Sequence, residues 1–395
     1  MDGLLLPPLM EIGFAFGGAI LAGIPALARI IWDLYLWTSW RNRRLPAEET
    51  QLPLDPSVSL ILCVHNDLAA LQRIWPKWRG QTFPKEWNVE WMIVDDGSTD
   101  GTGDWLKSRS QKDPMSLTVM HHTKTSPGKK GALATGIRAA KHETVVLTDA
   151  DCLPEPHWAF SMASALTHTS SPTDVALGFS LPKGGPALLQ FDALRVAWQY
   201  GTEAAKGQAY MGVGRNLAYR KSDWIRLGGF AAHSDLASGD DDLFVQSARR
   251  DGLSIRPLPP QQSSMANPTA AAQGIADGFR RKRRHLTTAK RYSNRDTIKL
   301  ALDAALDPMA AMGAAAGAFG LLHNPGWIPL VAIGLAVVAR AVTLSSFAKD
   351  LGHPAKNGLS AIWLGPIRWG FLAVATLSNF TSSPKWTQRA LTNRS

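Results

Sequence analysis

Apolar and polar positions alternate along the middle of the chain in a pattern that predicts strands and helices in turn. Short continuous apolar runs, typical of strands buried on both faces, occur at Val58–Val64, Trp91–Val94, Leu117–Met120, Thr144–Leu147 and Val175–Phe179. Segments with helical character separate most of them, at Asp67–Trp78, Thr102–Arg109, Lys130–Lys141 and His157–Thr167. This alternation predicts an α/β fold with a doubly wound, mostly parallel sheet, in which ligands bind beyond the carboxyl ends of the strands.

Longer apolar segments flank this alternating region. The first, Leu9–Trp32, is long enough to span a bilayer with an apolar core of about 30 Å. A cleaved signal peptide is the alternative, but no basic region precedes the apolar run. Three further candidates follow at Ala301–Leu322, Trp327–Phe347 and Leu359–Phe380, for which an apolar helical cap of a soluble protein is the alternative.

The distribution of positive charge indicates how these segments are oriented. Arg41, Arg43 and Arg44 follow the first segment and favour a cytoplasmic location for the region after it. With three C-terminal spans the basic tail Lys385–Arg394 would end outside, against the same rule. The sequence therefore leaves open whether all three C-terminal segments span the membrane or one is re-entrant or interfacial.

The overall charge of the chain indicates which classes of molecule it can bind. The chain has 42 Lys and Arg against 32 Asp and Glu, a formal net charge of +10, which suits nucleic acid, anionic lipid or phosphorylated substrates. Much of the excess lies in Phe279–Arg295, which precedes the first C-terminal apolar segment and is expected to lie flat on anionic lipid. Nucleic acid is not expected, because few aromatic residues interleave these charges. Cys63 and Cys152 lack the spacing of a zinc site and are expected to be reduced thiols.

Acidic residues follow two of the predicted strands. Asp95 and Asp96 come directly after Val94, where carboxylates can accept hydrogen bonds from a ribose or a base; a plain Asp-Gly turn is the alternative. Asp149 and Asp151 close a later strand on the same side of the chain. Two such carboxylates repel unless a cation lies beside them, so the pair predicts a site for Mg²⁺ or Mn²⁺; a solvated acidic turn is the alternative.

Two further segments carry candidate chemistry. Lys129 lies in the Gly128–Gly131 segment that opens a predicted helix, and such a helix N-terminus favours anionic groups; a solvated basic turn is the alternative. This is not a Walker A loop, because Thr123 stands where that motif needs glycine. Asp240–Asp242 precede another helix, whose N-terminus accounts for one or two acids, and one is a candidate general base.

Taken together, these motifs resemble family-2 glycosyltransferases with the GT-A fold, over about residues 58–292. The segments that carry the resemblance are Cys63–Asp67, Asp95–Ser98, Gly128–Lys129, Asp149–Asp151, Gly212–Arg220, Gly228–Phe230 and Gly239–Asp240. The resemblance implies donor-binding roles for Asp67, Asp95, Asp96, Lys129, Asp149 and Arg284, and metal binding by Asp151 with Asp149. It implies a general base at Asp240, with Asp241 as the neighbouring candidate because Gly239 replaces the family's Glu. Arg281–His285 keeps only the Arg of the Gln-x-x-Arg-Trp motif of processive synthases, which argues against a processive polymerase.

The resemblance implies inverting, metal-dependent transfer of a sugar from a nucleotide-sugar donor to a membrane-associated, lipid-linked or glycan acceptor. The expected division is an anchor at 1–45, the glycosyltransferase domain at 46–295, and transmembrane helices with a tail at 296–395, in a multi-pass inner-membrane protein whose catalytic domain faces the cytoplasm. Two alternatives remain: a sugar-phosphate nucleotidyltransferase, whose glycine-rich signature is absent, and a catalytically inactive scaffold of the same fold.

Overall fold

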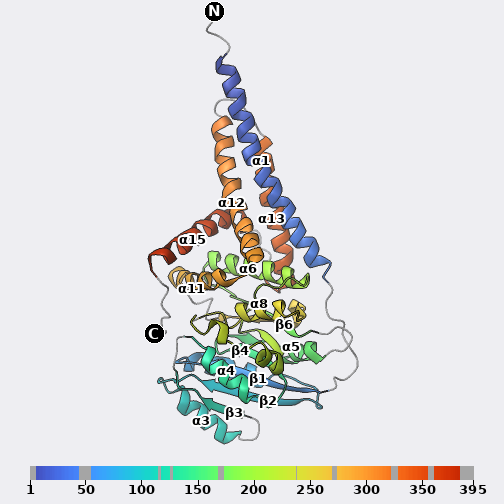
Figure 1. The fold of residues 1–395 in the computed structure, drawn as a ribbon, viewed down its shortest axis with the longest axis vertical. Helices are drawn as coiled ribbons and strands as arrows, with labels where there is room; N and C mark the ends of the chain where they lie inside the picture. Colours follow the sequence, from blue (N-terminus) through green and yellow to red (C-terminus); the bar gives the residue numbers. More distant parts are fainter. Residues whose placement is uncertain are drawn as a thin grey trace, which may run out of the picture.

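The computed structural model describes residues 6–43, 55–113, 117–124, 128–167, 173–236, 238–268, 274–321, 328–354 and 360–382. The molecule is elongated, with a domain built on a sheet at one end and a group of long helices at the other (Figure 1).

Seven strands form the main sheet, in the order β3-β2-β1-β4-β8-β6-β9. They are β1 (Ser57–Val64), β2 (Asn88–Asp95), β3 (Leu117–His121), β4 (Thr144–Asp149), β6 (Val175–Leu177), β8 (Leu217–Arg220) and β9 (Ile255–Pro257). β1 pairs in parallel with β2 and β4, and so do β2 with β3 and β6 with β9. β8 is antiparallel to both of its neighbours, β4 and β6. The described sheet is therefore mostly parallel, as predicted, with one reversed strand in its interior.

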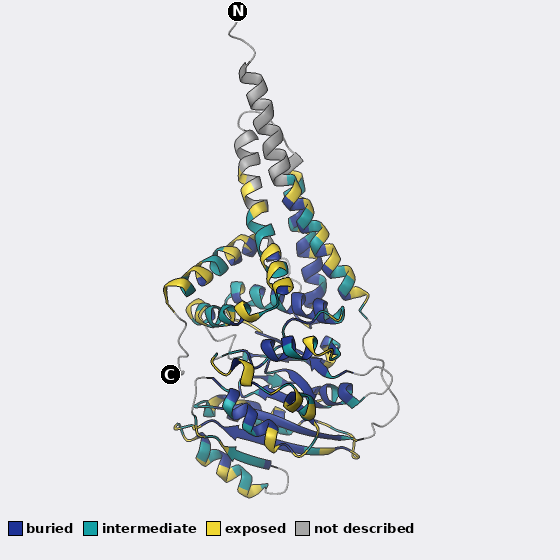
Figure 2. Ribbon diagram, in the orientation of Figure 1, coloured by how far each residue is buried: buried dark blue, intermediate teal, exposed yellow. Residues whose placement is uncertain are grey.

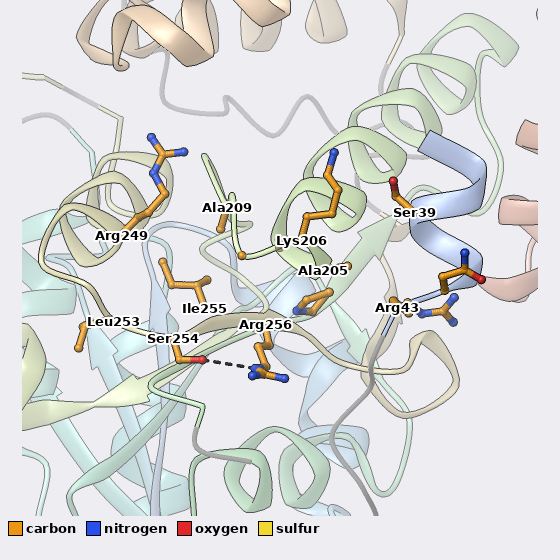
Figure 3. Close-up of a pocket in the computed structure, with 14 residues that line it drawn as sticks. Ser39, Arg43, Ala205, Lys206, Ala209, Arg249, Leu253, Ser254, Ile255 and Arg256 are labelled. Atoms are coloured by element: carbon orange, nitrogen blue, oxygen red, sulfur yellow. Dashed lines mark hydrogen bonds between the residues drawn. The ribbon is translucent and has the colours of Figure 1, made fainter. Parts of the chain in front are cut away.

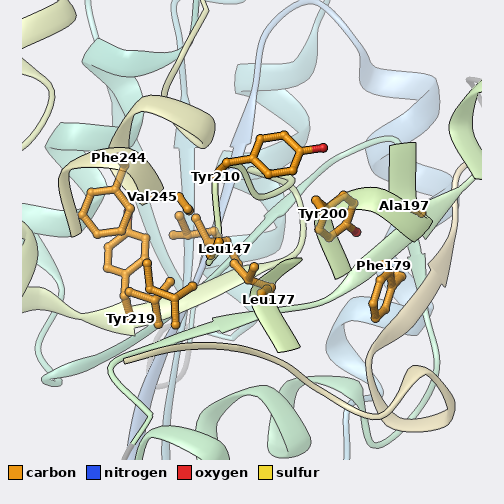
Figure 4. Close-up of a cluster of buried hydrophobic side chains, with 14 of the residues drawn as sticks. Leu147, Leu177, Phe179, Ala197, Tyr200, Tyr210, Tyr219, Phe244 and Val245 are labelled. Atoms are coloured by element: carbon orange, nitrogen blue, oxygen red, sulfur yellow. The ribbon is translucent and has the colours of Figure 1, made fainter. Parts of the chain in front are cut away.

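Helices cover both faces of this sheet, which explains the continuous apolar runs. Alternate residues of β1 belong to two cores: Leu60 and Leu62 pack on one face, Ile61 and Cys63 on the other. The first core contains side chains of α2 (Leu68–Arg79), α3 (Thr102–Lys112) and α5 (Trp158–Thr167). The second contains side chains of α4 (Lys130–Ala139), α6 (Ala187–Ala205) and α8 (Asp242–Arg250). Figure 4 shows part of this second core, where Tyr219 of the sheet lies against Phe244.

The predicted strand Val175–Phe179 is wrong in one respect, because the chain changes sheets inside it. β7 (Phe179–Leu181) belongs to a smaller sheet, where it pairs with β10 (Ser264–Ala266), which pairs in turn with β5 (Leu153–Pro154). The break falls at Gly178, where a Cβ would lie 2.0 Å from Asn216 Oδ1. The Asn216 amide also donates to the Phe179 carbonyl, so this close approach fixes the change of sheet.

Short elements complete the sheet domain. They are α7 (Lys221–Arg226), η1 (Ala231–His233), α9 (Pro260–Ser263), α11 (Ile275–Thr288) and η2 (Ala289–Arg291). The basic segment predicted at Phe279–Arg295 thus falls on α11, η2 and the few residues that follow them.

Three long helices extend away from the sheet domain and a fourth diverges from them (Figure 1). The three are α1 (Leu6–Arg41), α12 (Asn294–Leu321) and α13 (Ile328–Asp350), and α1 contacts both of the others. The fourth, α15 (Ala361–Thr381), contacts α11 and α6. Large apolar side chains are exposed on all four helices, and such patches mark membrane or protein contacts. Figure 2 shows exposed residues at intervals along the described parts of these helices.

Among the described residues, one segment, Leu330–Asp350, has the length and composition to cross a bilayer. It overlaps the predicted span Trp327–Phe347. Much of the predicted spans Leu9–Trp32 and Ala301–Leu322 falls on residues whose side chains lie outside the described set, and so does the whole tail Lys385–Arg394.

A cluster of charged side chains, here called the ionic cluster, joins the long helices to α6. Asp303 of α12 accepts hydrogen bonds from Arg29 of α1 at 2.8 Å and from Arg195 of α6 at 2.9 Å. Arg29 also pairs with Asp33, and Arg340 of α13 pairs with Asp307. These side chains are buried or nearly so, and buried charges are tolerated only beside opposite charges. The cluster therefore ties four helices, and the two ends of the molecule, together.

Candidate active site

The predicted acids at strand ends lie along one edge of the sheet. In the parallel register of β1 with its neighbours, Val64 pairs with Asp95 and Cys63 pairs with Asp149. The ends of β1, β2 and β4 therefore coincide, and their acids gather where open α/β sheets bind ligands.

The turn after β2 is held in place by its own hydrogen bonds. Asp95 is buried, accepts a hydrogen bond from the Ser98 N–H at 3.1 Å and contacts His121. Asp96 is also buried and pairs with Lys124, which donates to the Gly128 carbonyl at 2.8 Å. Lys124 is a functional candidate that the sequence did not reveal, because it is close to Asp96 only in the folded chain.

The turn after β1 holds the predicted residue Asp67, which directly precedes α2. Its carboxylate does not cap the helix; the Leu68 N–H instead donates to Asp100 Oδ2 at 3.1 Å. Asn66 has a positive φ of 48° and accepts a hydrogen bond from the Thr99 N–H at 2.7 Å. This bond links the turns after β1 and β2, so Asp67 and Asp96 lie on connected loops.

Lys129 brings two distant acids together. Its Nζ lies 2.7 Å from Asp149 Oδ1 and 3.2 Å from Asp240 Oδ2. Burial alone would lower the pKa of Lys129, but the two carboxylates raise that pKa well above its ordinary value. A permanently charged ammonium therefore lies between the predicted metal ligand and the predicted base.

The three consecutive acids before α8 have different partners. Asp241 caps the helix, with Oδ1 accepting from the Asp242 N–H at 2.8 Å and Oδ2 from the Gly214 N–H at 2.9 Å. Asp242 accepts hydrogen bonds from Thr288 at 2.6 Å and from Tyr292 at 2.7 Å, which ties α8 to the segment around α11. Asp240 is thus the acid of the three that faces Lys129.

The pKa values of Asp240 and Asp241 are shifted in opposite directions. Burial, together with the charges of Asp240 and Asp242, raises the pKa of Asp241 above its ordinary value. Burial acts in the same direction on Asp240, but Lys129 outweighs it and holds the pKa of Asp240 below the ordinary value. Asp240 is therefore ionised at neutral pH and can accept a proton.

A cavity of about 220 Å³, here called the sheet-edge cavity, collects most of the predicted residues. Lys129, Asp149, Asp240, Asp241 and Arg284 all line it. Its wall also includes residues without a predicted role, among them Arg215, Arg281, His285 and Phe371. Arg215 donates to Ser180 at 3.0 Å. Phe371 comes from α15, which is so far along the chain that no local sequence pattern indicates its place in the cavity wall.

The remaining predicted residues lie beside this cavity rather than in it. The Nδ2 atom of Asn267, a residue of the cavity wall, is 3.4 Å from Asp151 Oδ1. Asp95 ends β2 at the same sheet edge, and Asp67 and Asp96 lie on the adjoining loops; none of the three lines the cavity.

The donor set of Asp149 and Asp151 fits a hard divalent cation. No group of three or more His, Cys, Asp or Glu side chains converges among the described residues. Asp149 keeps 27% of its side-chain surface exposed, and both acids offer carboxylate oxygens. Mg²⁺ and Mn²⁺ are commonly held by one or two carboxylates, with phosphate oxygens of a substrate completing the coordination.

Comparison with known proteins agrees with this geometry. Residues 59–223 match the family model of glycosyl transferase family 2. The chain is 28% identical over 204 residues to glycosyltransferase AglE of Haloferax volcanii, which covers 51% of this chain and 64% of that protein. It is 41% identical over 68 residues to the undecaprenyl-phosphate mannosyltransferase of Micrococcus luteus, which covers 16% and 27%. The chain thus matches less than two thirds of the length of either relative.

A solved structure shares the fold over nearly the whole chain. It is the mannosyltransferase PcManGT from Pyrobaculum calidifontis in complex with GDP-Man and Mn²⁺, with a TM-score of 0.56 and 22% sequence identity, covering 93% of this chain and 99% of that one. The match of residues 59–223 to the family model and this likeness of fold agree with the acids gathered at the sheet edge, and this segment of the chain is a glycosyl transferase family 2 domain.

Proposed function

We propose that the protein is an inverting, metal-dependent glycosyltransferase that moves a sugar from a nucleotide-sugar donor to a membrane-associated, lipid-linked acceptor. The observation that carries the proposal is the sheet-edge cavity, where Lys129 links Asp149 to Asp240 beneath the basic helix α11. The undecaprenyl-phosphate mannosyltransferase among the relatives supports a lipid-linked acceptor, and the GDP-Man and Mn²⁺ of the similar structure support the donor class and the metal.

The donor would extend along the sheet edge. Asp67, Asp95 and Asp96 would hold the nucleoside, because they lie at the end of β2 and on the loops beside the cavity. Lys129 and Arg284 would hold the diphosphate inside it. A divalent cation at Asp149 and Asp151 would neutralise charge on the departing nucleoside diphosphate.

Asp240 would act as the general base. Its carboxylate lies in the cavity wall and is kept ionised by Lys129, so it can accept the proton of an acceptor hydroxyl. That oxygen then attacks the anomeric carbon from the face opposite the diphosphate, and the configuration inverts. Asp241 would position Asp240, because it holds the start of α8 against Gly214.

The long helices would place this site at the cytoplasmic face of the inner membrane. With the anchor at 1–45 and the membrane region at 296–395, α1, α12 and α13 would span the bilayer, since they extend together from the sheet domain at 46–295 (Figure 1). α15 diverges from them and would lie at the interface. Three spans leave the basic tail Lys385–Arg394 on the cytoplasmic side, in agreement with positive-inside bias.

The position of α15 supports an acceptor that arrives from the membrane. Phe371 lines the sheet-edge cavity and packs against Phe279 of α11, with ring centroids 5.6 Å apart. On the same helix, Leu377 is 65% and Phe380 is 77% exposed. A helix with an exposed apolar surface that also reaches the cavity provides a route from the lipid interface to the base.

A donor screen on the purified full-length protein tests the proposal. Nucleotide sugars are supplied with Mn²⁺ or Mg²⁺ and a lipid extract, and both nucleoside-diphosphate release and lipid-extractable label are measured. We expect both signals with at least one donor. Release of inorganic diphosphate in a parallel reaction that supplies a nucleoside triphosphate and a sugar 1-phosphate would instead identify a nucleotidyltransferase. The absence of both products, together with no metal-dependent donor binding by calorimetry, would identify an inactive scaffold.

A further inference from the structure

A second cavity, here called the basic cavity, lies away from the sheet edge and has a volume of about 590 Å³. The last turn of α1, the C-terminal end of α6 and the segment from α8 to β9 enclose it, as Figure 3 shows. The basic cavity and the sheet-edge cavity share no lining residue. Nothing in the proposed transfer of a sugar uses it.

Positive charge dominates this cavity. Four cationic side chains line it, and its described lining contains no acidic residue. The four are Arg43, Lys206, Arg249 and Arg256. Like charges around one space favour an anion to the extent that carboxylates outside the lining leave them unpaired.

Carboxylates outside the lining hold three of these cations in place. Lys206 pairs with Glu203 at 2.7 Å, Arg249 pairs with Asp296, and Arg43 lies 3.9 Å from Asp350. Arg43 also donates to the Trp40 carbonyl at 2.7 Å, which is an ordinary role for a basic residue at a helix C-terminus. These contacts give three of the four cations a carboxylate partner, and the fourth cation, Arg256, remains to be accounted for.

Arg256 has no carboxylate partner among the described residues. Its Nε donates to Ser254 Oγ at 3.3 Å, the bond drawn as a dashed line in Figure 3. Neutral donors also line the cavity, namely the side-chain amide of Asn42 and the hydroxyl of Ser39, and neither has a hydrogen-bond partner among the described residues. A guanidinium together with neutral donors matches the several acceptor oxygens of a phosphate group.

We propose that the basic cavity binds a phosphate group, carried by the headgroup of an anionic phospholipid or by a soluble phosphate compound. Its position suits the first source, because Tyr35, which is 44% exposed, lies on the end of α1 that borders the cavity, and aromatic residues gather at membrane interfaces. The charge and the donors suit both sources.

Binding to the full-length protein in neutral detergent tests the proposal. Short-chain phosphatidylglycerol, short-chain phosphatidylcholine and inorganic phosphate are titrated separately by calorimetry, and the thermal midpoint is followed, since a ligand of the folded state raises it. We expect saturable binding of phosphatidylglycerol, of phosphate, or of both. Binding of the lipid alone identifies a headgroup site, and binding of both with similar affinity identifies a site for soluble phosphates.

Variants locate the binding. Arg256→Gln should weaken it about tenfold, and Arg256→Lys, which keeps the charge, should weaken it less. Arg226→Gln is the matched control, because Arg226 is an exposed arginine of α7 that pairs with Asp223 and Asp251. If Arg256→Gln does not fold, Asn42→Ala removes a different donor from the cavity and should also weaken binding.

Three results would overturn the proposal: no saturable binding of either anionic probe, equal affinity for phosphatidylcholine and phosphatidylglycerol, or the same affinity in the Arg256 and Arg226 variants. Because binding is measured directly, these results leave the proposed sugar transfer untouched.

Discussion

The ionic cluster and the sheet-edge cavity contain the same types of charged residue, but these residues serve different purposes. In the ionic cluster, Arg29 and Arg195 share Asp303 and are shielded from solvent. At the sheet edge, Lys129 is shared by Asp149 and Asp240, and all three line a cavity. Charges that are paired and enclosed stabilise one arrangement, whereas charges that border a cavity can exchange their partners for a ligand. The comparison predicts that sheet-edge substitutions remove activity and ionic-cluster substitutions remove stability.

The largest expected effect is on turnover. Asp240→Asn removes the proton acceptor and should lower the rate of nucleoside-diphosphate release by about 10²- to 10⁴-fold. Donor affinity, measured by calorimetry, should change little. Asp235→Asn is the control, because that acid is exposed and pairs with Arg291 on the surface. A rate close to that of the unmodified enzyme would exclude Asp240 as the base.

The next effect is on stability. Asp303→Ala leaves Arg29 and Arg195 buried without their shared carboxylate, which should cost about 3–5 kcal/mol and lower the thermal midpoint in detergent. Asp251→Ala, which breaks an exposed pair with Arg226, should leave the midpoint nearly unchanged. Equal midpoints for the two variants would show that the ionic cluster does not hold the molecule together.

A smaller effect concerns the metal. Asp151→Ala removes one of two proposed ligands and should shift the Mn²⁺ activation curve to concentrations at least about tenfold higher, with loss of activity at low Mn²⁺. Asp104→Ala, at an exposed position of α3, should leave the curve in place. Undiminished transfer in excess chelator would contradict the proposed metal site.

The smallest effect is a dependence of stability on pH. The folded pKa of Asp241 lies above the unfolded value of about 4, so the folded state binds more protons and loses stability as the pH rises above that value. Asp241→Asn removes this titration and should raise the free energy of unfolding at pH 8 by on the order of 1–2 kcal/mol, seen as a higher thermal midpoint, but hardly at pH 4. A constant difference across this pH range would mean that Asp241 titrates normally.

The acids of the sheet edge could be predicted because they depend on local pattern. Asp95 and Asp149 each close an apolar strand, and parallel strands bring their ends to one edge. The change of sheet at Gly178 could not be predicted, since a run of apolar residues does not show which strand its members pair with. Its cause is the side chain of Asn216, which is distant in sequence.

Long-range contacts also account for the site residues that were missed. Phe371 reaches the cavity because α15 turns away from the other long helices, whereas its apolar sequence predicts only a candidate span. Lys124 became a candidate only through its contact with Asp96. The boundaries at residues 45 and 295 and the number of membrane spans stay predictions.

The position of helix α6 limits how the protein can be re-engineered. One part of it, including Asp192 and Tyr200, lines the sheet-edge cavity, while Arg195 meets Asp303 of α12. A chimera that exchanges the long helices for those of another protein would leave Arg195 without its partner Asp303, close to the sheet-edge cavity. The long helices and the sheet-edge cavity must therefore be transplanted and redesigned together.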